Sequence, residues 1–332
     1  MSGGVDSSVA AALLKKQGFQ VMGVFMRFWK EAEGENRCCS LDAVKRAKQV
    51  AQILKIPFYI FNFTKEFKKA VVDAFLKDYR LGLTPNPCVV CNKEIKLGLL
   101  LKRAKALSFD YVATGHYARK MGTKLYQSRN KEKDQSYFLW KLNREQLKHL
   151  LFPLSDYTKK EVRRQAKELG LPVFDTPESQ EICFVEKEVN EFLKRHLKIK
   201  KGKIIDSRGN ILGDHQGLPL YTLGQRKGIG LSQGPFWVKG KDFKKNLLIV
   251  TKNEKDLLKK ELSFREVNWL SGKPPKLPAK LKAKIRSRHE ASFGVLKKGN
   301  RFIFNKPQKA ITPGQSVVFY RNSELLGGGI IS

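Results

Sequence analysis

The N-terminal part of the chain alternates between short apolar runs and stretches in which apolar residues recur every three or four positions. The first pattern is typical of buried strands and the second of amphipathic helices. The predicted strands cover 20–26, 57–63 and 110–114. The predicted helices cover 9–14, 40–55 and 65–81. Alternating strands and helices favour a parallel sheet covered on both faces, in which ligands bind beyond the carboxyl ends of the strands.

Two further helices are predicted after this alternation. Thr158 and Glu161 have the spacing of a capping box, and the helix that they begin ends before Gly170 and Pro172. Another helix is expected over 186–197. Together with the preceding pattern, these helices complete an α/β domain that we expect to span residues 1–197.

From about Lys198 the pattern changes to short alternating strands separated by glycine-containing turns. We expect a central β-rich domain over 198–262, which contains the basic, glycine-flanked loop 223–228. That loop could contact phosphate or be an ordinary exposed turn. Residues 263–332 alternate again and are expected to form a small barrel. The predicted fold class is therefore α/β: a parallel-sheet domain followed by two small β-rich domains, the last a β-barrel.

Charge changes this picture by indicating a partner. The 332 residues include 65 Lys and Arg but 31 Asp and Glu, a net charge of +34. Such an excess favours a polyanion such as a nucleic acid; lysine-rich codon usage or heat adaptation is the alternative. No apolar run approaches the roughly 20 residues that a membrane span needs, and no secretory signal is recognisable. We therefore expect a cytosolic protein that does not enter a membrane.

The opening segment resembles a phosphate-binding loop that leads into a helix. Its residues are Ser2, Gly3, Gly4, Val5, Asp6, Ser7 and Ser8. Two glycines let the backbone approach an anion, while amides, hydroxyls and the helix N-terminus supply donors. The lysine of a Walker loop is absent, which indicates a different nucleotide chemistry. A simple capped helix start is the alternative.

Five cysteines suggest reactive or metal-binding thiols, because an odd number in a cytosolic chain argues against a disulfide framework. They are Cys38, Cys39, Cys88, Cys91 and Cys183. Prolines stiffen the loop before Cys91, and Asn92 could cap a helix that contains Ile95. A thiol at a helix N-terminus beside lysines should be nucleophilic. The Cys-x-x-Cys pair could belong to a zinc site, a redox couple or a sulfur-transfer site with Cys183.

Two polar segments are further candidates, each with a plain structural alternative. Gly115 follows a predicted strand and could allow close approach to adenine or ribose, and His116 could meet substrate. The alternative is an ordinary turn with a surface histidine. Residues 133–138 combine charge, amide and aromatic groups that could contact RNA, or they form a solvated turn.

These segments together resemble one enzyme family. The opening loop is similar to the Ser-Gly-Gly-x-Asp-Ser signature of the PP-loop ATP pyrophosphatase superfamily, which implies that the parallel-sheet domain is HUP-like. Thr-Pro-Asn-Pro-x-x-x-Cys-Asn-Lys-Glu-Ile-Lys, Ala-Thr-Gly-His-Tyr, Lys-Asp-Gln-Ser-Tyr-Phe-Leu, Ile-Cys-Phe, His-Gln-Gly-Leu, Thr-Leu-Gly-Gln-Arg-Lys-Gly and Thr-Pro-Gly-Gln follow in order. This set resembles the bacterial tRNA-specific 2-thiouridylases over essentially the whole chain. The superfamily places a buried strand before the loop, so we expect that residues precede Met1 in the natural protein.

The resemblance implies a reaction and its participants. ATP with Mg²⁺ would bind the opening loop, with Met26 and Gly115 on the adenine side. The C2 oxygen of the tRNA wobble uridine would be adenylated, and a persulfide on Cys183 would supply sulfur while Cys91 closes a disulfide with Cys183. The implied partners of this cytoplasmic monomer are tRNA and a sulfur-relay protein or cysteine desulfurase.

The resemblance also implies tRNA contacts. The residues are Asn86, Pro87 and Cys88 at the target base, and His116, Lys133, Asp134, Gln135, Arg286, Ser287 and Gln315 elsewhere. The familiar family pattern has aspartate where this chain has Cys88. Cys88, Cys91 and Cys183 could therefore hold a [4Fe-4S] cluster as the sulfur carrier, an alternative left open here together with the persulfide.

Two other functions are compatible with parts of the sequence. Another PP-loop enzyme, such as an amide-forming ligase, would not require Cys91 and Cys183. A non-catalytic RNA-binding protein with a decayed ATP site would form no AMP.

Overall fold

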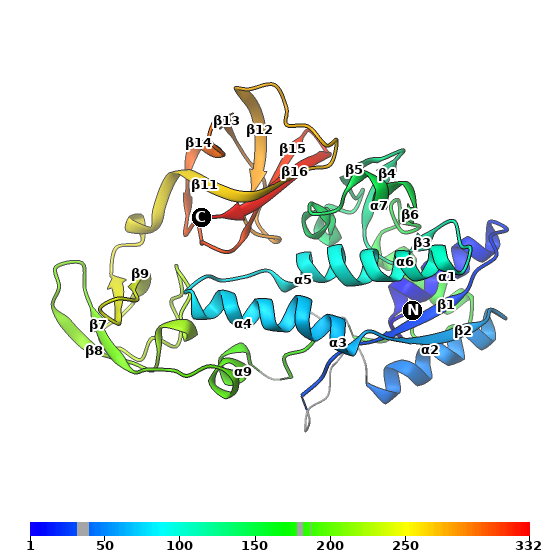
Figure 1. Cartoon of the computed structure of the whole chain (residues 1–332), viewed down its shortest axis with the longest axis horizontal. Coiled ribbons are helices and arrows are strands. Elements are labelled where there is room, and N and C mark those ends of the chain that lie inside the picture. The colour runs from blue at the N-terminus through cyan, green and yellow to red at the C-terminus, as the bar shows by residue number, and fades with distance from the viewer. Residues whose placement is uncertain (32–39, 178–181, 187) are drawn as a thin grey trace.

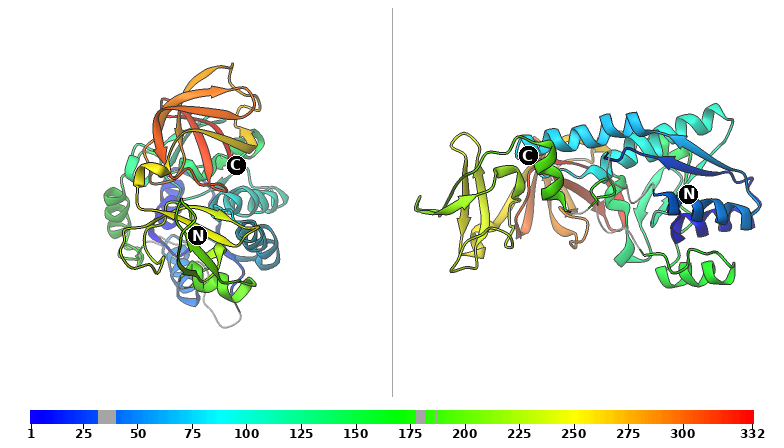
Figure 2. Two further views of the ribbon diagram at one scale, coloured as in Figure 1. Left: turned by 90° about the vertical axis from the view of Figure 1, so that its left-hand side faces the viewer. Right: turned by 90° about the horizontal axis from the view of Figure 1, so that it is seen from below.

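The computed structural model describes residues 1–31, 40–177, 182–186 and 188–332. Cys38 and Cys39 lie outside the described residues. Figure 1 shows an α/β domain at one end of the long axis, a small sheet at the other end and a β-barrel over the middle. The views in Figure 2 show the same order from two other sides. The predicted fold class, an α/β domain followed by two β-rich domains with a barrel last, is confirmed.

The parallel strands of the α/β domain form two pairs. Strand β1 pairs with β2, and β3 pairs with β6. The strands are β1 (Gly23–Arg27), β2 (Phe58–Asn62), β3 (Val112–Ala113) and β6 (Leu150–Leu151). The predicted strand at 110–114 is thus reduced to two residues. Met1 donates from its amino group to the Val24 carbonyl of β1.

Helices connect these strands as the apolar spacing predicts. They are α1 (Val5–Lys16), α2 (Leu41–Ile53), α3 (Thr64–Phe67), α4 (Asp73–Arg80), α5 (Pro87–Val90), α6 (Leu100–Ala106), α7 (Arg144–Lys148), α8 (Lys159–Glu168) and α9 (Val189–His196). The capping box is confirmed: Thr158 caps α8, its hydroxyl accepts from the Glu161 N–H, and the Glu161 carboxylate accepts in return. Short 3₁₀ turns are η3 (Lys131–Lys133), η4 (Ser136–Leu139), η5 (Leu218–Leu220) and η6 (Glu254–Leu257).

Two long helical segments contain π-helical turns, which the sequence analysis did not predict. The turns are η1 (Lys68–Val72), between α3 and α4, and η2 (Cys91–Leu99), between α5 and α6. The two segments lie side by side in Figure 1, and η1 contacts both α5 and η2. The second segment carries the Cys-x-x-Cys pair, so its register matters for the site.

The central domain is a four-stranded sheet in the order β8-β7-β10-β9. Its strands are β7 (Gly202–Ile205), β8 (Ile211–His215), β9 (Trp237–Asp242) and β10 (Leu247–Thr251). Its core continues into the α/β domain, because Leu218 and Val238 belong to the same apolar cluster as Phe75 and Phe192.

The C-terminal domain is a closed barrel, because the pairing of β11 with β16 joins the two ends of its sheet. Its strands are β11 (Leu258–Trp269), β12 (Ala279–Lys284), β13 (Ser292–Lys297), β14 (Arg301–Lys309), β15 (Ser316–Arg321) and β16 (Glu324–Ile331). The predicted domain boundary at 262 therefore falls within β11. A hairpin of the α/β domain, β4 (Ala118–Met121) and β5 (Lys124–Gln127), extends the barrel sheet through β16.

The described part of the chain contains no helix that is both long and apolar enough to cross a membrane.

Candidate functional site

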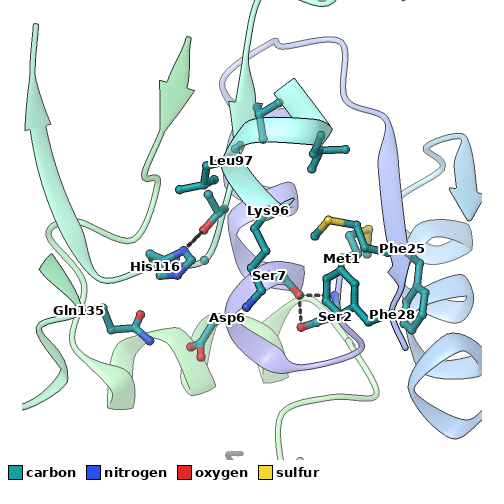
Figure 3. A pocket seen from close by; sticks show the side chains of 16 residues that line it. Met1, Ser2, Asp6, Ser7, Phe25, Phe28, Lys96, Leu97, His116 and Gln135 are labelled. Carbon is teal, nitrogen blue, oxygen red and sulfur yellow. Dashed lines mark hydrogen bonds between the residues drawn. The ribbon is translucent and has the colours of Figure 1, made fainter. Parts of the chain in front are cut away.

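A cavity of about 240 Å³ lies where the N-terminus of α1 meets the end of β1 and the loop after β3. Figure 3 shows Ser2, Asp6 and Ser7 on one side and His116 and Gln135 on another. Met26, near the end of β1, also lines it. This position beyond strand ends is where a parallel sheet is expected to bind a ligand.

The opening loop has the tight geometry that its glycines predict. Gly3 has a φ of +72°, and a Cβ on it would lie 2.3 Å from the Ala43 carbonyl oxygen of α2. Gly4 is the N-cap of α1, so it brings no side-chain acceptor to the amide groups of the first turn. The Ser7 and Ser8 hydroxyls donate to the Gly4 carbonyl at 3.1 and 3.0 Å. The result is a helix start with the uncapped amides that suit an anion.

Gly115 lines the cavity and also permits a close backbone approach. A Cβ at this position would lie 2.7 Å from the Asp6 carbonyl carbon and 2.8 Å from the Ser7 nitrogen. The loop after β3 can therefore pack directly on the first turn of α1. This approach explains the glycine without reference to a ligand, and the predicted contact with adenine or ribose stays a prediction.

Asp6 is held by two side chains that the sequence analysis did not single out. The Tyr117 hydroxyl donates to Asp6 Oδ1 at 2.8 Å. Lys159 Nζ lies 2.7 and 2.8 Å from the two carboxylate oxygens, and its side chain is 12% exposed. Lys159 is the first residue of α8, directly after the capping threonine. The capping box therefore predicted that a helix begins at Lys159, but it did not predict that the Lys159 side chain reaches Asp6.

His116 is a neutral imidazole at physiological pH. Burial lowers its pKa from 6.5 to about 3, and the positive charge of Lys96 acts in the same direction. Its backbone N–H donates to the Thr114 hydroxyl at 3.0 Å, and its ring contacts the same oxygen. His116 lines the cavity and can exchange hydrogen bonds there, but it cannot serve as a cation.

The predicted RNA-contacting residues at 133–135 differ in their surroundings. Asp134 is buried, and its carboxylate accepts from the N–H groups of Ser128 and Ser136 and from the Ser136 hydroxyl. The Asp134 carboxylate therefore stabilises the conformation of its own loop. Gln135 lines the cavity and accepts from the Tyr117 N–H at 3.0 Å. Lys133 is half-buried at the end of η3.

The helix that carries the Cys-x-x-Cys pair begins earlier than predicted. Asn86 is the N-cap and Pro87 the first helical residue, a position that suits proline because its missing N–H would have no partner there. Asn92 is not a cap, because it is buried and donates to the Phe138 carbonyl. The prediction that Cys91 lies at a helix N-terminus was therefore wrong, and exposed Cys88 is the thiol in the first turn.

Cys91 and Cys183 nevertheless pack in the same apolar cluster. Cys91 is 5% exposed within it, and half-buried Cys183 packs against it. Phe28 belongs to this cluster and also lines the cavity, as do Met26 and Leu100 at its edge. The apolar cluster that contains the two thiols and the candidate nucleotide cavity therefore have these three residues in common.

The described residues do not form a metal-binding group in this conformation. No three His, Cys, Asp or Glu side chains among them lie close enough together to hold a metal ion. Cys88, Cys91 and Cys183 are all described, so their arrangement does not fit the three-cysteine cluster considered from sequence.

A second, larger cavity of about 530 Å³ lies where the three domains meet. Thr84 contributes from the α/β domain, Gln225 from the central domain, and Arg286, Ser287 and Gln315 from the barrel. Arg288 and His289 add two further basic side chains. Among the described residues that line this cavity there is no Asp or Glu.

The barrel is held against the segment that leads to Cys88. The Thr84 N–H donates to the Pro313 carbonyl at 3.0 Å, and Gln315 Nε2 donates to the Thr84 carbonyl at 2.8 Å. Arg286 Nη2 donates to the Ala310 carbonyl at 2.7 Å, which fixes the guanidinium. The structure thus places Thr84, two positions before Asn86, beside Gln315 in the cavity that Arg286 and Ser287 also line. His116 and Gln135 line the first cavity instead.

Comparison with known proteins gives full-length matches. Residues 1–187, 190–252 and 259–331 match family models described as a tRNA methyl transferase HUP domain, a tRNA methyl transferase PRC-barrel domain and an aminomethyltransferase beta-barrel domain. The tRNA-specific 2-thiouridylase MnmA of Moorella thermoacetica is 47% identical over 351 residues, covering 100% of this chain and 98% of the relative. The enzyme of the same name from Clostridioides difficile is 45% identical, covering 100% and 96%.

Among solved structures, the U34-tRNA thiolase NcsA from Methanococcus maripaludis with its [4Fe-4S] cluster matches with a TM-score of 0.36 and 21% identity, over 55% of this chain and 59% of that one. A TM-score this low supports no inference about the present chain. Family membership is supported by the full-length identity to the curated relatives, together with the opening loop and the residues that the cavity shares with the cluster of Cys91 and Cys183. These findings show that the chain belongs to the tRNA-specific 2-thiouridylase family.

Proposed function

We propose that the protein catalyses ATP-dependent 2-thiolation of the wobble uridine of tRNA. The observation that carries this proposal is the junction of two sites: a cavity bordered by a phosphate-type loop shares Phe28, Met26 and Leu100 with the apolar cluster of Cys91 and Cys183. Adenylation and sulfur transfer on one uridine require the nucleotide and the two thiols to reach the same base, since the activated base cannot travel far between steps.

In the first step the uridine C2 oxygen attacks the α-phosphate of ATP, and pyrophosphate leaves. The amides at Gly3 and Gly4 and the hydroxyls of Ser2, Ser7 and Ser8 are suited to the departing pyrophosphate. The Asp6 carboxylate and neighbouring hydroxyls fit Mg²⁺, which would neutralise phosphate charge when bound. Val5 anchors the first turn in the core, and Met26 and Gly115 would border the adenine.

In the second step a Cys183 persulfide attacks C2 through its terminal sulfur, and AMP leaves with the former C2 oxygen. The Cys91 thiolate then attacks the Cys183 sulfur, which breaks the sulfur–sulfur bond to the base and leaves 2-thiouridine with a Cys91–Cys183 disulfide. An external thiol must reduce that disulfide before the next cycle. A sulfur-relay protein or cysteine desulfurase supplies the persulfide, and the enzyme acts as a cytoplasmic monomer.

The tRNA would lie across the three-domain cavity, with its target base near Asn86, Pro87 and Cys88. Arg286, Ser287 and Gln315 would contact the anticodon region, and the acid-free lining of that cavity suits a phosphate backbone. His116, Lys133 and Gln135 would meet the nucleotides nearer the first cavity, with Asp134 holding their loop in shape. Since the three cysteines do not form a metal-binding group here, we derive no step through a [4Fe-4S] cluster.

The test is an assay of purified protein with ATP, unmodified tRNA and a low-molecular-weight persulfide. We expect AMP to form in step with 2-thiouridine, measured by mass spectrometry of digested tRNA. Mass also separates exchange of oxygen for sulfur from addition of a methyl group, the chemistry named in two of the family-model descriptions.

Cysteine variants distinguish the mechanisms. Cys91→Ser and Cys183→Ser should each abolish thiolation while leaving tRNA binding intact. If the persulfide route operates, Cys88→Ser should retain thiolation activity. If each of the three substitutions removed both the thiolation activity and the bound iron, the result would support the cluster instead. Full activity in both Cys91→Ser and Cys183→Ser would indicate another PP-loop ligase, and absence of AMP formation would indicate a non-catalytic RNA-binding protein.

A further inference from the structure

Lys96 is a cavity residue that the sequence analysis did not assign. It lies in η2, five positions after Cys91, and lines the cavity beside the opening loop. Figure 3 shows its side chain extending between His116 and the loop, with its amino end next to Asp6 and Ser7. Its charge is close enough to His116 to contribute to the lowered pKa of that imidazole.

The charge balance of the cavity gives Lys96 a particular importance. His116 is neutral, and Asp6 is paired with Lys159. Among the described residues that line the cavity, Lys96 is therefore the one whose side chain carries a positive charge at neutral pH. A triphosphate needs such a charge, and the opening loop lacks the lysine that a Walker loop would supply.

The direction of Lys96 depends on the π-helical turns of η2. A π-turn bonds residues five apart, whereas an α-helix brings residues three and four apart to the same side. The Leu100 N–H donates to the Ile95 carbonyl in this way. Cys91 and Lys96, five apart, therefore lie on nearly the same side of η2, which in a regular α-helix they would not.

Two residues hold this register, Gln146 through its side chain and Gly98 through the absence of one. Gln146 of α7 donates from Nε2 to the Lys93 carbonyl at 3.0 Å and to the Leu97 carbonyl at 2.9 Å. Its Oε1 accepts from Lys93 Nζ at 2.8 Å and from the Asn143 N–H at 3.1 Å. At Gly98 a Cβ would lie 2.5 Å from the Lys93 carbonyl oxygen, so the turn closes tightly only over a glycine.

We propose that Lys96 is the phosphate-binding cation of this cavity, and that Gln146 and Gly98 are positioning residues that hold it there by fixing the π-helical register of η2. The proposal rests on the proposed function in one respect, that the cavity binds ATP. It adds that the helix carrying the thiol pair also carries the cation for the nucleotide.

The experiment compares the affinities of ATP and adenosine by titration calorimetry on the full-length protein. Lys96→Met should weaken ATP binding by about 10- to 100-fold, the range for a lost charge-assisted hydrogen bond, and leave adenosine binding unchanged. Lys96→Arg should recover much of the loss. Lys102→Met is the matched control, because Lys102 is an exposed lysine of the same helical segment, and it should change neither affinity.

Gln146→Glu tests the positioning role with a nearly isosteric side chain. The carboxylate keeps acceptors for the Asn143 N–H and Lys93 Nζ but loses both donors to the carbonyls of η2. ATP affinity should fall by about threefold or more, the size expected for the loss of even one ordinary hydrogen bond, while adenosine affinity stays near wild type. The melting temperature should fall, because two carbonyls of η2 lose their donor.

The outcomes separate this proposal from the proposed function. If the wild-type protein binds no ATP, the proposed function fails. If the wild type binds ATP but Lys96→Met weakens ATP and adenosine equally, or weakens neither, the phosphate role is overturned. If Gln146→Glu keeps the wild-type ratio of the two affinities, the positioning role is overturned.

Discussion

The cavity beside the opening loop and the cavity between the three domains are built in different ways. The smaller one, about 240 Å³, is lined by residues of the α/β domain alone and centres on a contiguous loop at the start of α1. The larger one, about 530 Å³, draws on all three domains and has several basic side chains but no acidic one among its described lining residues. The first has the properties of a nucleotide site, and the second those of a surface for a polyanion. The comparison shows how one chain can separate activation of a substrate from its docking.

The largest expected effect is at Asp6. Asp6→Asn removes the carboxylate that fits Mg²⁺ and leaves Lys159, 12% exposed, without its counter-charge. We expect AMP formation to fall by about 100-fold or more, the size typical for removal of one electrostatic contact that stabilises the reacting groups. Affinity for tRNA, measured by filter binding, should not change. Glu191→Gln, which removes an exposed carboxylate paired with Lys194, is the control. A parallel loss of tRNA affinity would show that the two cavities are not separate.

Gly314→Ala should have the opposite selectivity, because it disturbs the larger cavity and should weaken tRNA binding without affecting ATP binding. Gly314 has a φ of +90°, and its added Cβ would lie 2.7 Å from the Thr84 nitrogen at the contact between barrel and α/β domain. We expect a loss of about 2 kcal/mol in the free energy of unfolding, with weaker tRNA binding and normal ATP binding. Gly299→Ala is a matched control, because Gly299 also has a positive φ, +73°, but has nothing within 4 Å of its added Cβ. Equal destabilisation by both variants would mean that backbone strain, and not the domain contact, is responsible.

Arg286→Ala should affect tRNA binding with little effect on ATP. We expect about a tenfold loss of affinity and a salt dependence that is shallower by about one unit of slope, as for removal of one phosphate contact. Filter binding over a series of salt concentrations measures both quantities. An unchanged slope would show that Arg286 acts through its bond to the Ala310 carbonyl and not on the tRNA.

The smallest expected effect concerns pH. The pKa of His116 is lowered from 6.5 to about 3 in the folded protein. The unfolded chain therefore binds a proton as pH falls through about 6.5, while the folded chain does so only near 3, and stability is lost on acidification through that window. Between about pH 6 and about pH 5 the wild type should lose about 1 kcal/mol more than His116→Asn in urea titrations. Identical losses would show that the folded imidazole titrates normally.

Local features of the α/β domain, the smaller cavity included, were predictable from sequence because they depend on neighbouring residues. The two glycines of the opening loop, the capping box at Thr158 and the strand-helix alternation are encoded by backbone propensities and short-range hydrogen bonds. The helix start at Pro87 was also predictable in principle, since proline is locally preferred at the first helical position. The sequence analysis instead placed the cap of this helix at Asn92.

Contacts between distant residues could not be predicted, because they depend on how the elements pack. Lys159 reaches Asp6 across 153 positions of sequence. The hairpin of β4 and β5 completes a sheet whose other strands begin at Leu258. Likewise, the bonds from Gln146 and the crowding at Gly98, rather than the apolar spacing, determine that η2 is π-helical and turns Lys96 toward the nucleotide cavity. The sequence by itself determined the chemical groups and their local supports, and the tertiary structure decided which of these groups meet, because only packing sets distances between segments far apart in the chain.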